Sequence, residues 1–79
     1  MYVTLQSGSK MAYVGFEKSD ADIEVAKSVR LDQWADEAGT EAMHALTLDF
    51  DANGRLVGIE VWDAKRVLPQ TLIDEAQRI

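Results

Sequence analysis

The sequence contains no cysteine and only one proline in 79 residues. Without cysteine the chain can form neither a disulfide framework nor a thiolate metal site. Its apolar runs are a few residues long, far short of the ~20 that a transmembrane helix needs. The first ten residues also lack the charged and apolar regions of a secretory signal. We therefore expect a cytoplasmic protein.

Basic residues are scarce, with 8 Lys and Arg against 14 Asp and Glu, so the net charge is −6 at pH 7. Such a chain is repelled by phosphates and anionic lipids, and we expect neither a nucleic-acid nor a membrane partner. The hydrophobic content of 47% is typical of a globular domain. We expect a single domain over residues 1–79. Small domains without disulfides often gain stability by oligomerising, so we also expect a homodimer.

Two short strands are predicted within residues 1–17. In the first, Val3 and Leu5 alternate with polar neighbours. The second, residues 11–17, is rich in aromatic and β-branched residues, which favour strands. The polar residues 6–10 between them predict a turn. Gly15 indicates a bulge or a close backbone contact within the second strand.

Residues 23–32 predict a third strand, because their β-branched residues repeat with a period of two. A helix opened by a capping box from Ser19 to Asp22 is the alternative. Residues 33–44 are rich in alanine and glutamate but are interrupted by Gly39. They predict a surface excursion with partial helix.

The clearest prediction is a β-hairpin over residues 45–62 that turns at Asn53 and Gly54. Both residues tolerate the positive φ that a type I′ turn requires. A two-residue or a four-residue loop places apolar residues in facing pairs on one side: Phe50 with Val57, Leu48 with Ile59, and Leu46 with Val61. A three-residue loop would set Leu46 against Glu60, and the sequence therefore disfavours it.

The chain should end in a helix over residues 68–79, reached through a connector over 63–67. Pro69 suits the first helical position, where its missing N–H costs nothing. The expected fold class is α+β: an antiparallel meander of four to five strands with one C-terminal helix packed on one face. The expected core contains Leu5, Val14, Val25, Val29, Leu46, Leu48, Phe50, Val57, Ile59, Val61, Leu72 and Ile73.

One segment matches a metal-binding pattern. Residues 49–54 followed by Glu60 fit the D-x-D-x-N-G-x5-E string of a calcium EF-hand loop. The flanking residues favour strands and not the helices that an EF-hand needs, so a hairpin is the preferred interpretation. The alternative is a divalent-metal (calcium) site on that hairpin, with these candidate ligands: Asp49, Asp51, Asn53 and Glu60.

Catalytic machinery is not evident in the sequence. His44 is the only histidine and has no cysteine or serine elbow to act with, and no phosphate-binding loop occurs. We expect no enzyme, no catalytic residue and no cofactor. An enzyme that shares a site between chains, lined by His44 or carboxylates, is a further alternative. Trp34 and Trp62 are candidate interface anchors, since tryptophan is enriched at the centres of interfaces.

The segment Asp49–Ala64 closely resembles the small prokaryotic "domain of unknown function 2283" family, whose hallmark is an acidic strand, a tight turn with glycine, and a V-G-I-E-(I/V)-x-x-A strand. Tyr13-Val14 and residues 25–29 match more loosely, and residues 33–44 look like an insertion. The resemblance implies a compact antiparallel sheet with a C-terminal helix. It supplies no activity, cofactor or catalytic residue. Some members are suspected to neutralise a small toxin.

Together these observations favour a non-enzymatic protein-interaction module. Its expected partners are a second copy of itself and a small basic protein, such as a toxin, that an acidic surface would attract. A calcium-binding domain is the alternative function.

Overall fold

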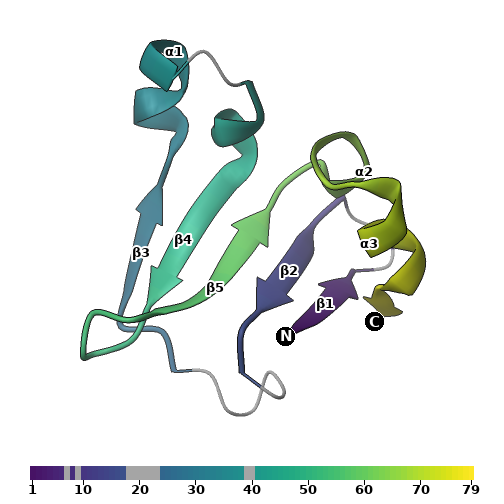
Figure 1. Ribbon diagram of the computed structural model, residues 1–79, viewed down its shortest axis with the longest axis horizontal. Helices are drawn as coiled ribbons and strands as arrows, with labels where there is room; N and C mark the ends of the chain where they lie inside the picture. The colour runs from purple at the N-terminus through teal and green to yellow at the C-terminus, as the bar shows by residue number, and fades with distance from the viewer. Residues whose placement is uncertain (7, 9, 18–23, 39–40) are drawn as a thin grey trace.

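The computed structural model describes residues 1–6, 8, 10–17, 24–38 and 41–79 (Figure 1). Its strands are β1 (Tyr2–Leu5), β2 (Ala12–Gly15), β3 (Lys27–Arg30), β4 (Leu46–Phe50), β5 (Leu56–Val61) and β6 (Gln77–Arg78). Its helical segments are η2 (Asp32–Trp34), α1 (Ala35–Ala38), η3 (Glu41–Ala45), α2 (Ala64–Val67) and α3 (Gln70–Glu75). The described part of the chain is therefore α+β, as the sequence predicts.

The strands form one six-stranded sheet in the order β3-β4-β5-β2-β1-β6. Neighbouring strands are antiparallel except β1 and β6, which are parallel. The expectation of a purely antiparallel meander with four to five strands is therefore wrong. The reason is the path of the chain after β5. Its helices α2 and α3 lead past β2 and β1, and the last residues then pair with β1 as a sixth strand.

The C-terminal helix is shorter than predicted. Pro69 is extended (ψ 146°) and caps α3 instead of occupying its first turn, and α3 ends at Glu75. Ala76 is also extended, so the last residues pair with β1, and the Ile79 N–H donates to the Leu5 carbonyl at 3.0 Å. The helix predicted over residues 68–79 is thus replaced by α3 and β6. The predicted connector contains α2.

The β4–β5 hairpin turns over a three-residue loop, residues 52–54, which the sequence analysis disfavours. Asp51 and Arg55 close this loop, with the Asp51 N–H donating to the Arg55 carbonyl at 2.9 Å. Gly54 has a positive φ of 80°, but Asn53 does not. The expected type I′ geometry at both residues is therefore wrong.

A β-bulge at Val57 compensates for the loop length. Phe50 pairs with Leu56 and not with Val57, whereas Asp49 pairs with Gly58, so Val57 is the extra residue. The remaining apolar pairs follow the predicted register: Leu48 with Ile59, and Leu46 with Val61. The bulge thus restores the pairing of apolar side chains that a three-residue loop alone would lose.

The excursion between β3 and β4 is partly helical, as predicted for residues 33–44. It is built from η2, α1 and η3 and lies at one end of β3 and β4 (Figure 1). The third strand is shorter than residues 23–32. The proposed capping box, Ile23 and Gly39 lie outside the described residues.

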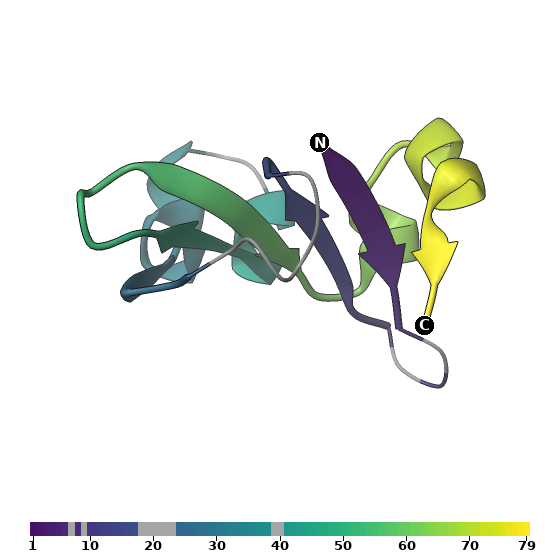
Figure 2. The ribbon, with the colours of Figure 1, turned by 90° about the horizontal axis from the view of Figure 1, so that it is seen from below.

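The core lies at one end of the sheet, where α2 and α3 cover it. Figure 2 shows both helices on one side of the sheet, near β1 and β6. The buried cluster there consists of Leu5, Ala12, Val14, Val61, Ala64 and Ile73. None of the helices in the described ranges is long and apolar enough to cross a membrane.

The predicted core therefore extends over more strands than the observed core does. Val25 is exposed, and most of its predicted members on β3 and β4 are only half-buried: Val29, Leu46, Leu48 and Phe50. The reason is geometric. Six strands span about 24 Å, whereas α2 and α3, with four and six residues, measure only about 6 and 9 Å. They cannot cover the whole sheet.

Candidate functional site

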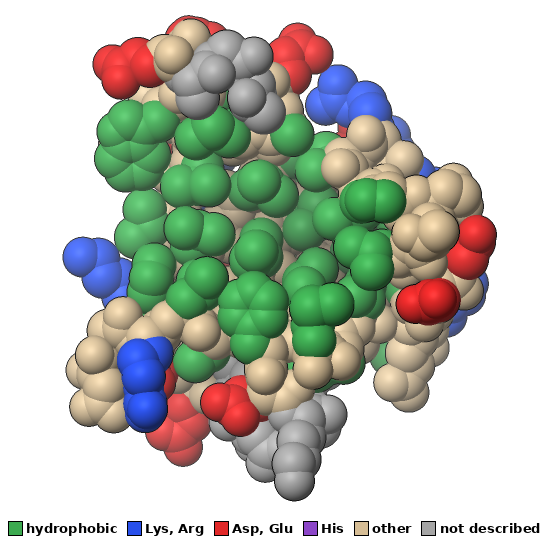
Figure 3. All heavy atoms as spheres, in the orientation of Figure 1, with side chains coloured by type: hydrophobic (Ala, Val, Ile, Leu, Met, Phe, Trp, Pro, Cys, Tyr) green, Lys and Arg blue, Asp and Glu red, His purple; other side chains and the backbone are tan. Residues whose placement is uncertain are grey.

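One face of the sheet is apolar and remains largely uncovered over β3, β4 and β5. Cross-strand register places these side chains on the same side: Val29, Leu46, Leu48, Phe50, Leu56 and Ile59. We call these six residues the open face. All six are half-buried or exposed, and Leu56 retains 40% of its accessible surface. Leu46 and Ile59 also pack against the covered core and form the inner border of the open face. Figure 3 shows hydrophobic side chains that form a continuous area across this side of the molecule.

Charged side chains lie around the open face and not within it. In Figure 3 the acidic and basic groups are at the periphery of the hydrophobic area. Lys27 lies on the edge strand β3, opposite Phe50 of β4, and therefore marks one margin of the open face. The surface of this strongly acidic chain is thus neutral where it is most apolar.

The opposite side of the sheet, which we call the polar face, carries a buried carboxylate. Asp49 is only 2% exposed, and its Oδ1 accepts a hydrogen bond of 2.6 Å from Ser28 Oγ. Glu60, on the neighbouring strand, is in contact with Asp49. Burial first, then the hydrogen bond and charge of Asp49, raise the pKa of Glu60 above its usual value. Glu60 therefore holds its proton more tightly than an exposed glutamate does.

Two tyrosines lie across the polar face over two glycines. A Cβ added at Gly15 would overlap the ring of Tyr2, and one added at Gly58 would overlap that of Tyr13. The two ring centroids are 6.3 Å apart, with planes tilted by 40°. The glycines pair with each other across β2 and β5, so the rings need this bare strip of backbone. This confirms the close contact that Gly15 predicts.

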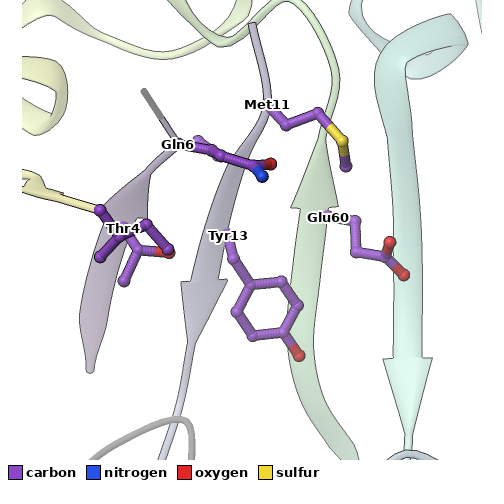
Figure 4. Close-up of a pocket in the computed structure, with 7 residues that line it drawn as sticks. Thr4, Gln6, Met11, Tyr13 and Glu60 are labelled. Carbon is purple, nitrogen blue, oxygen red and sulfur yellow. The ribbon is translucent and has the colours of Figure 1, made fainter. Parts of the chain in front are cut away.

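Next to these rings lies a shallow hollow of about 310 Å³. Figure 4 views the sheet from the side opposite to Figure 3 and shows Tyr13 of β2 beside Glu60 of β5. The hollow is lined by Thr4, Gln6, Met11, Ala12, Tyr13, Glu60 and Ile79. Its walls are mostly apolar, with one carboxyl group at the side.

The four candidate metal ligands do not form one site. Asp51 Oδ1 accepts hydrogen bonds from the backbone N–H groups of Asn53 (2.9 Å) and Arg55 (3.0 Å), and Arg55 Nε donates to Asp51 Oδ2 at 3.3 Å. These bonds, the Arg55 N–H first, lower the pKa of Asp51. Asp49 is bound to Ser28 instead. Within the described ranges no three acidic or histidine side chains could hold a metal ion together. The segment is a hairpin and not an EF-hand.

The two tryptophans occupy different places. Trp34 ends η2 and is 42% exposed. Trp62, 53% exposed, directly follows β5 and lines a depression of about 390 Å³ on the polar face, together with Glu60 and Arg30. The histidine, His44, lies in η3 with Nε2 3.8 Å from Asp36 Oδ1. Nothing in the described structure brings His44 to the carboxyl pair or to Trp62.

Sequence reasoning missed the open face, because it assigned a twelve-residue helix to cover the sheet. Pro69 was the one available signal that the helix starts later, whereas residues 76–79 contain no helix-breaking residue. It also missed the role of Gly58, although a glycine inside a strand is itself an indication of close approach.

Comparisons with known proteins identify the family to which the chain belongs. No curated protein matches the chain, and no solved structure matches it. A family model, described as "Protein of unknown function (DUF2283)", matches residues 7–65. This match covers β2 to β5 and the start of α2, including the segment Asp49–Ala64 on which the resemblance was strongest. The chain belongs to the DUF2283 family.

Proposed function

We propose that the protein is a non-enzymatic protein-interaction module and that the open face is its main binding surface. The observation that carries this proposal is the uncovered apolar area over β3, β4 and β5. Soluble monomers rarely leave a contiguous apolar patch larger than a few hundred Å² in water. A patch of this kind bordered by charged side chains is typical of a surface that binds another protein.

The polar face supports a second, weaker contact with a basic protein. Such a partner is expected because the chain has a net charge of −6. Trp62 offers an exposed ring, and Glu60 lies in the same depression. A lysine or arginine side chain is attracted both by an aromatic ring and by a carboxylate. The test is a titration with a basic peptide: Trp62→Ala should weaken its binding, whereas Trp34→Ala should not.

Site-specific photo-crosslinking tests the main proposal without assuming the identity of the partner. A photoreactive amino acid is placed at Leu48 on the open face and, as a control, at Thr71 on the exposed side of α3. The cells that express the variants are irradiated, and the products are identified by mass spectrometry. We expect a defined protein adduct from position 48 and none from position 71. Equal yields at both positions, or no adduct at 48, would refute the proposal.

A further inference from the structure

We infer that the occupant of the open face is a second copy of this chain, stacked face to face about a twofold axis that passes close to Leu48. This inference rests on the proposed binding surface and names its partner. Two sheets packed in this way would lie about 10 Å apart, as in a β-sandwich. In the dimer each chain would supply the layer that the other lacks.

The core of the single chain is incomplete. Among its large apolar side chains, Val61 alone in the described ranges is fully buried, and the buried leucine and isoleucine side chains there are Leu5 and Ile73. A stable domain needs two packed layers, but α2 and α3 supply a second layer at one end only. A 79-residue chain without disulfides has little stability to spare for an exposed apolar sheet.

The size of the molecule's broad side suits an interface between two copies. The molecule measures 34 × 32 × 20 Å, and the open face lies on its broad side. The product of the two long extents, 34 × 32 Å, gives that whole side, with α2 and α3 included, a projected area of roughly 1,000 Å². A standard interface buries about 800 Å² on each partner. The open face can therefore form the apolar centre of a standard interface, and the neighbouring helices and α1 its rim.

The distribution of charge also favours a second copy of the chain. A basic partner needs acidic contacts, but the six residues of the open face carry none, and the acidic side chains lie at the periphery. Two copies can therefore join here without bringing like charges together at the centre, although each has a net charge of −6. A neutral apolar surface fits another neutral apolar surface, and a second copy offers one of equal size.

The sheet edge offers a less suitable route to a dimer. The free edge strand β3 carries Lys27 and Arg30, and charged residues on an edge oppose strand pairing between molecules. The strand at the other edge, β6, has only two residues. Contact through the face is therefore favoured over extension of the sheet.

The position of the axis follows from symmetry. In a twofold dimer the same patch contacts itself, so its centre lies near the axis. β4 is the middle of the three strands, and Leu48 is the middle residue of β4, with Val29 and Ile59 as its register partners. Leu48 of one copy should therefore lie close to Leu48 of the other.

The absence of cysteine allows a clean test of this geometry. Leu48→Cys and, as a matched control, Trp62→Cys are oxidised under identical mild conditions, and the disulfide-linked dimer is measured over time. Trp62 is 53% exposed, whereas Leu48 is half-buried, so random collisions would link the control faster. We expect Leu48→Cys to link at least tenfold faster. An equal or slower rate would overturn the proposed axis.

Sedimentation equilibrium of the unmodified protein gives the oligomeric state independently of any variant. We expect a mass twice that of the 8.8 kDa chain at micromolar concentration. Leu48→Lys should shift the protein to monomer, and Trp62→Lys, the same change on the polar face, should leave it dimeric. A monomeric unmodified chain would refute the homodimer. If position 48 nevertheless crosslinked to a different protein, the interaction module would stand and only this inference would fall.

Discussion

The phenol ring of Tyr13 lies over the backbone of Gly58, at a distance that leaves no room for a Cβ atom. Tyr13 is on β2 and Gly58 on β5, two register positions apart, since Tyr13 pairs with Glu60 and Gly58 with Gly15. An aromatic ring placed across a glycine covers backbone that would otherwise have no side chain to protect it. The ring and the glycine therefore depend on each other.

Gly58→Ala should destabilise the fold. The new methyl group would force the Tyr13 ring away from the sheet and from Tyr2, its neighbour in the ring pair. Overpacking of this kind costs about 1–3 kcal/mol, which corresponds to a fall in Tm of roughly 4 °C or more for a domain of this size. Thermal unfolding followed by circular dichroism measures the effect.

The matched control is the same substitution in a Tyr13→Ala background, where no ring remains to be displaced. We expect Gly58→Ala to be nearly neutral there, so that the double-mutant cycle gives a large coupling energy. Equal costs in both backgrounds would show that the ring and the glycine are independent.

Glu60 should make stability fall as the pH rises. Burial and Asp49 raise its folded-state pKa above the ordinary value of 4.5, so the folded protein binds the proton more tightly than the unfolded chain. This contribution is fully present below pH 4.5 and is lost as the pH rises through the folded-state pKa. Glu60→Gln should therefore raise Tm at pH 7.5 and lose this advantage at pH 4. We expect a gain below about 1 kcal/mol, because Glu60 is partly exposed and water screens its interaction with Asp49.

The control for this effect is Glu75→Gln, the same change on the exposed side of α3. It should leave Tm nearly unchanged at both pH values. A Glu60→Gln advantage that persisted at pH 4 would assign the gain to something other than the raised pKa of Glu60.

The hairpin illustrates how far the sequence could predict the fold. The alternation of apolar residues identified both strands and the facing of Leu48 with Ile59, since a slip by one residue would expose them. It could not identify the three-residue loop, because Val57 absorbs the change of parity as a bulge. A pattern of alternation fixes which side chains face each other and not the path by which the chain turns.

The candidate site was harder to predict than the hairpin. The acidic string suggested one cluster, but Asp49 and Asp51 have separate partners, Ser28 and Arg55. Their local hydrogen bonds depend on strand pairing and turn geometry, which a string of residue types does not encode. The open face was also unpredictable, because it depends on where Glu75 ends α3.

Calcium should not stabilise the protein. Asp51 is occupied by the turn and Asp49 by Ser28, so binding would have to break existing hydrogen bonds. At a calcium concentration 100 times the dissociation constant, binding would add about 2.7 kcal/mol to the free energy of unfolding. This corresponds to a rise in Tm of more than roughly 10 °C. We expect no change in Tm between chelator and millimolar calcium, measured by differential scanning fluorimetry. A rise that Asp51→Asn abolished would restore the metal hypothesis.

Asp51→Ala should loosen the hairpin locally more than it lowers global stability. The substitution removes the acceptor of the Asn53 and Arg55 backbone N–H groups and the partner of the Arg55 side chain. Both amides should exchange with deuterium several-fold faster, because the turn opens more often. Amides in the centre of β4 and β5, such as that of Ile59, should change much less. Asp74→Ala, on the exposed side of α3, is the control and should leave the turn amides unchanged. Uniform acceleration along both strands in Asp51→Ala would instead mean that the turn governs the pairing of the whole hairpin.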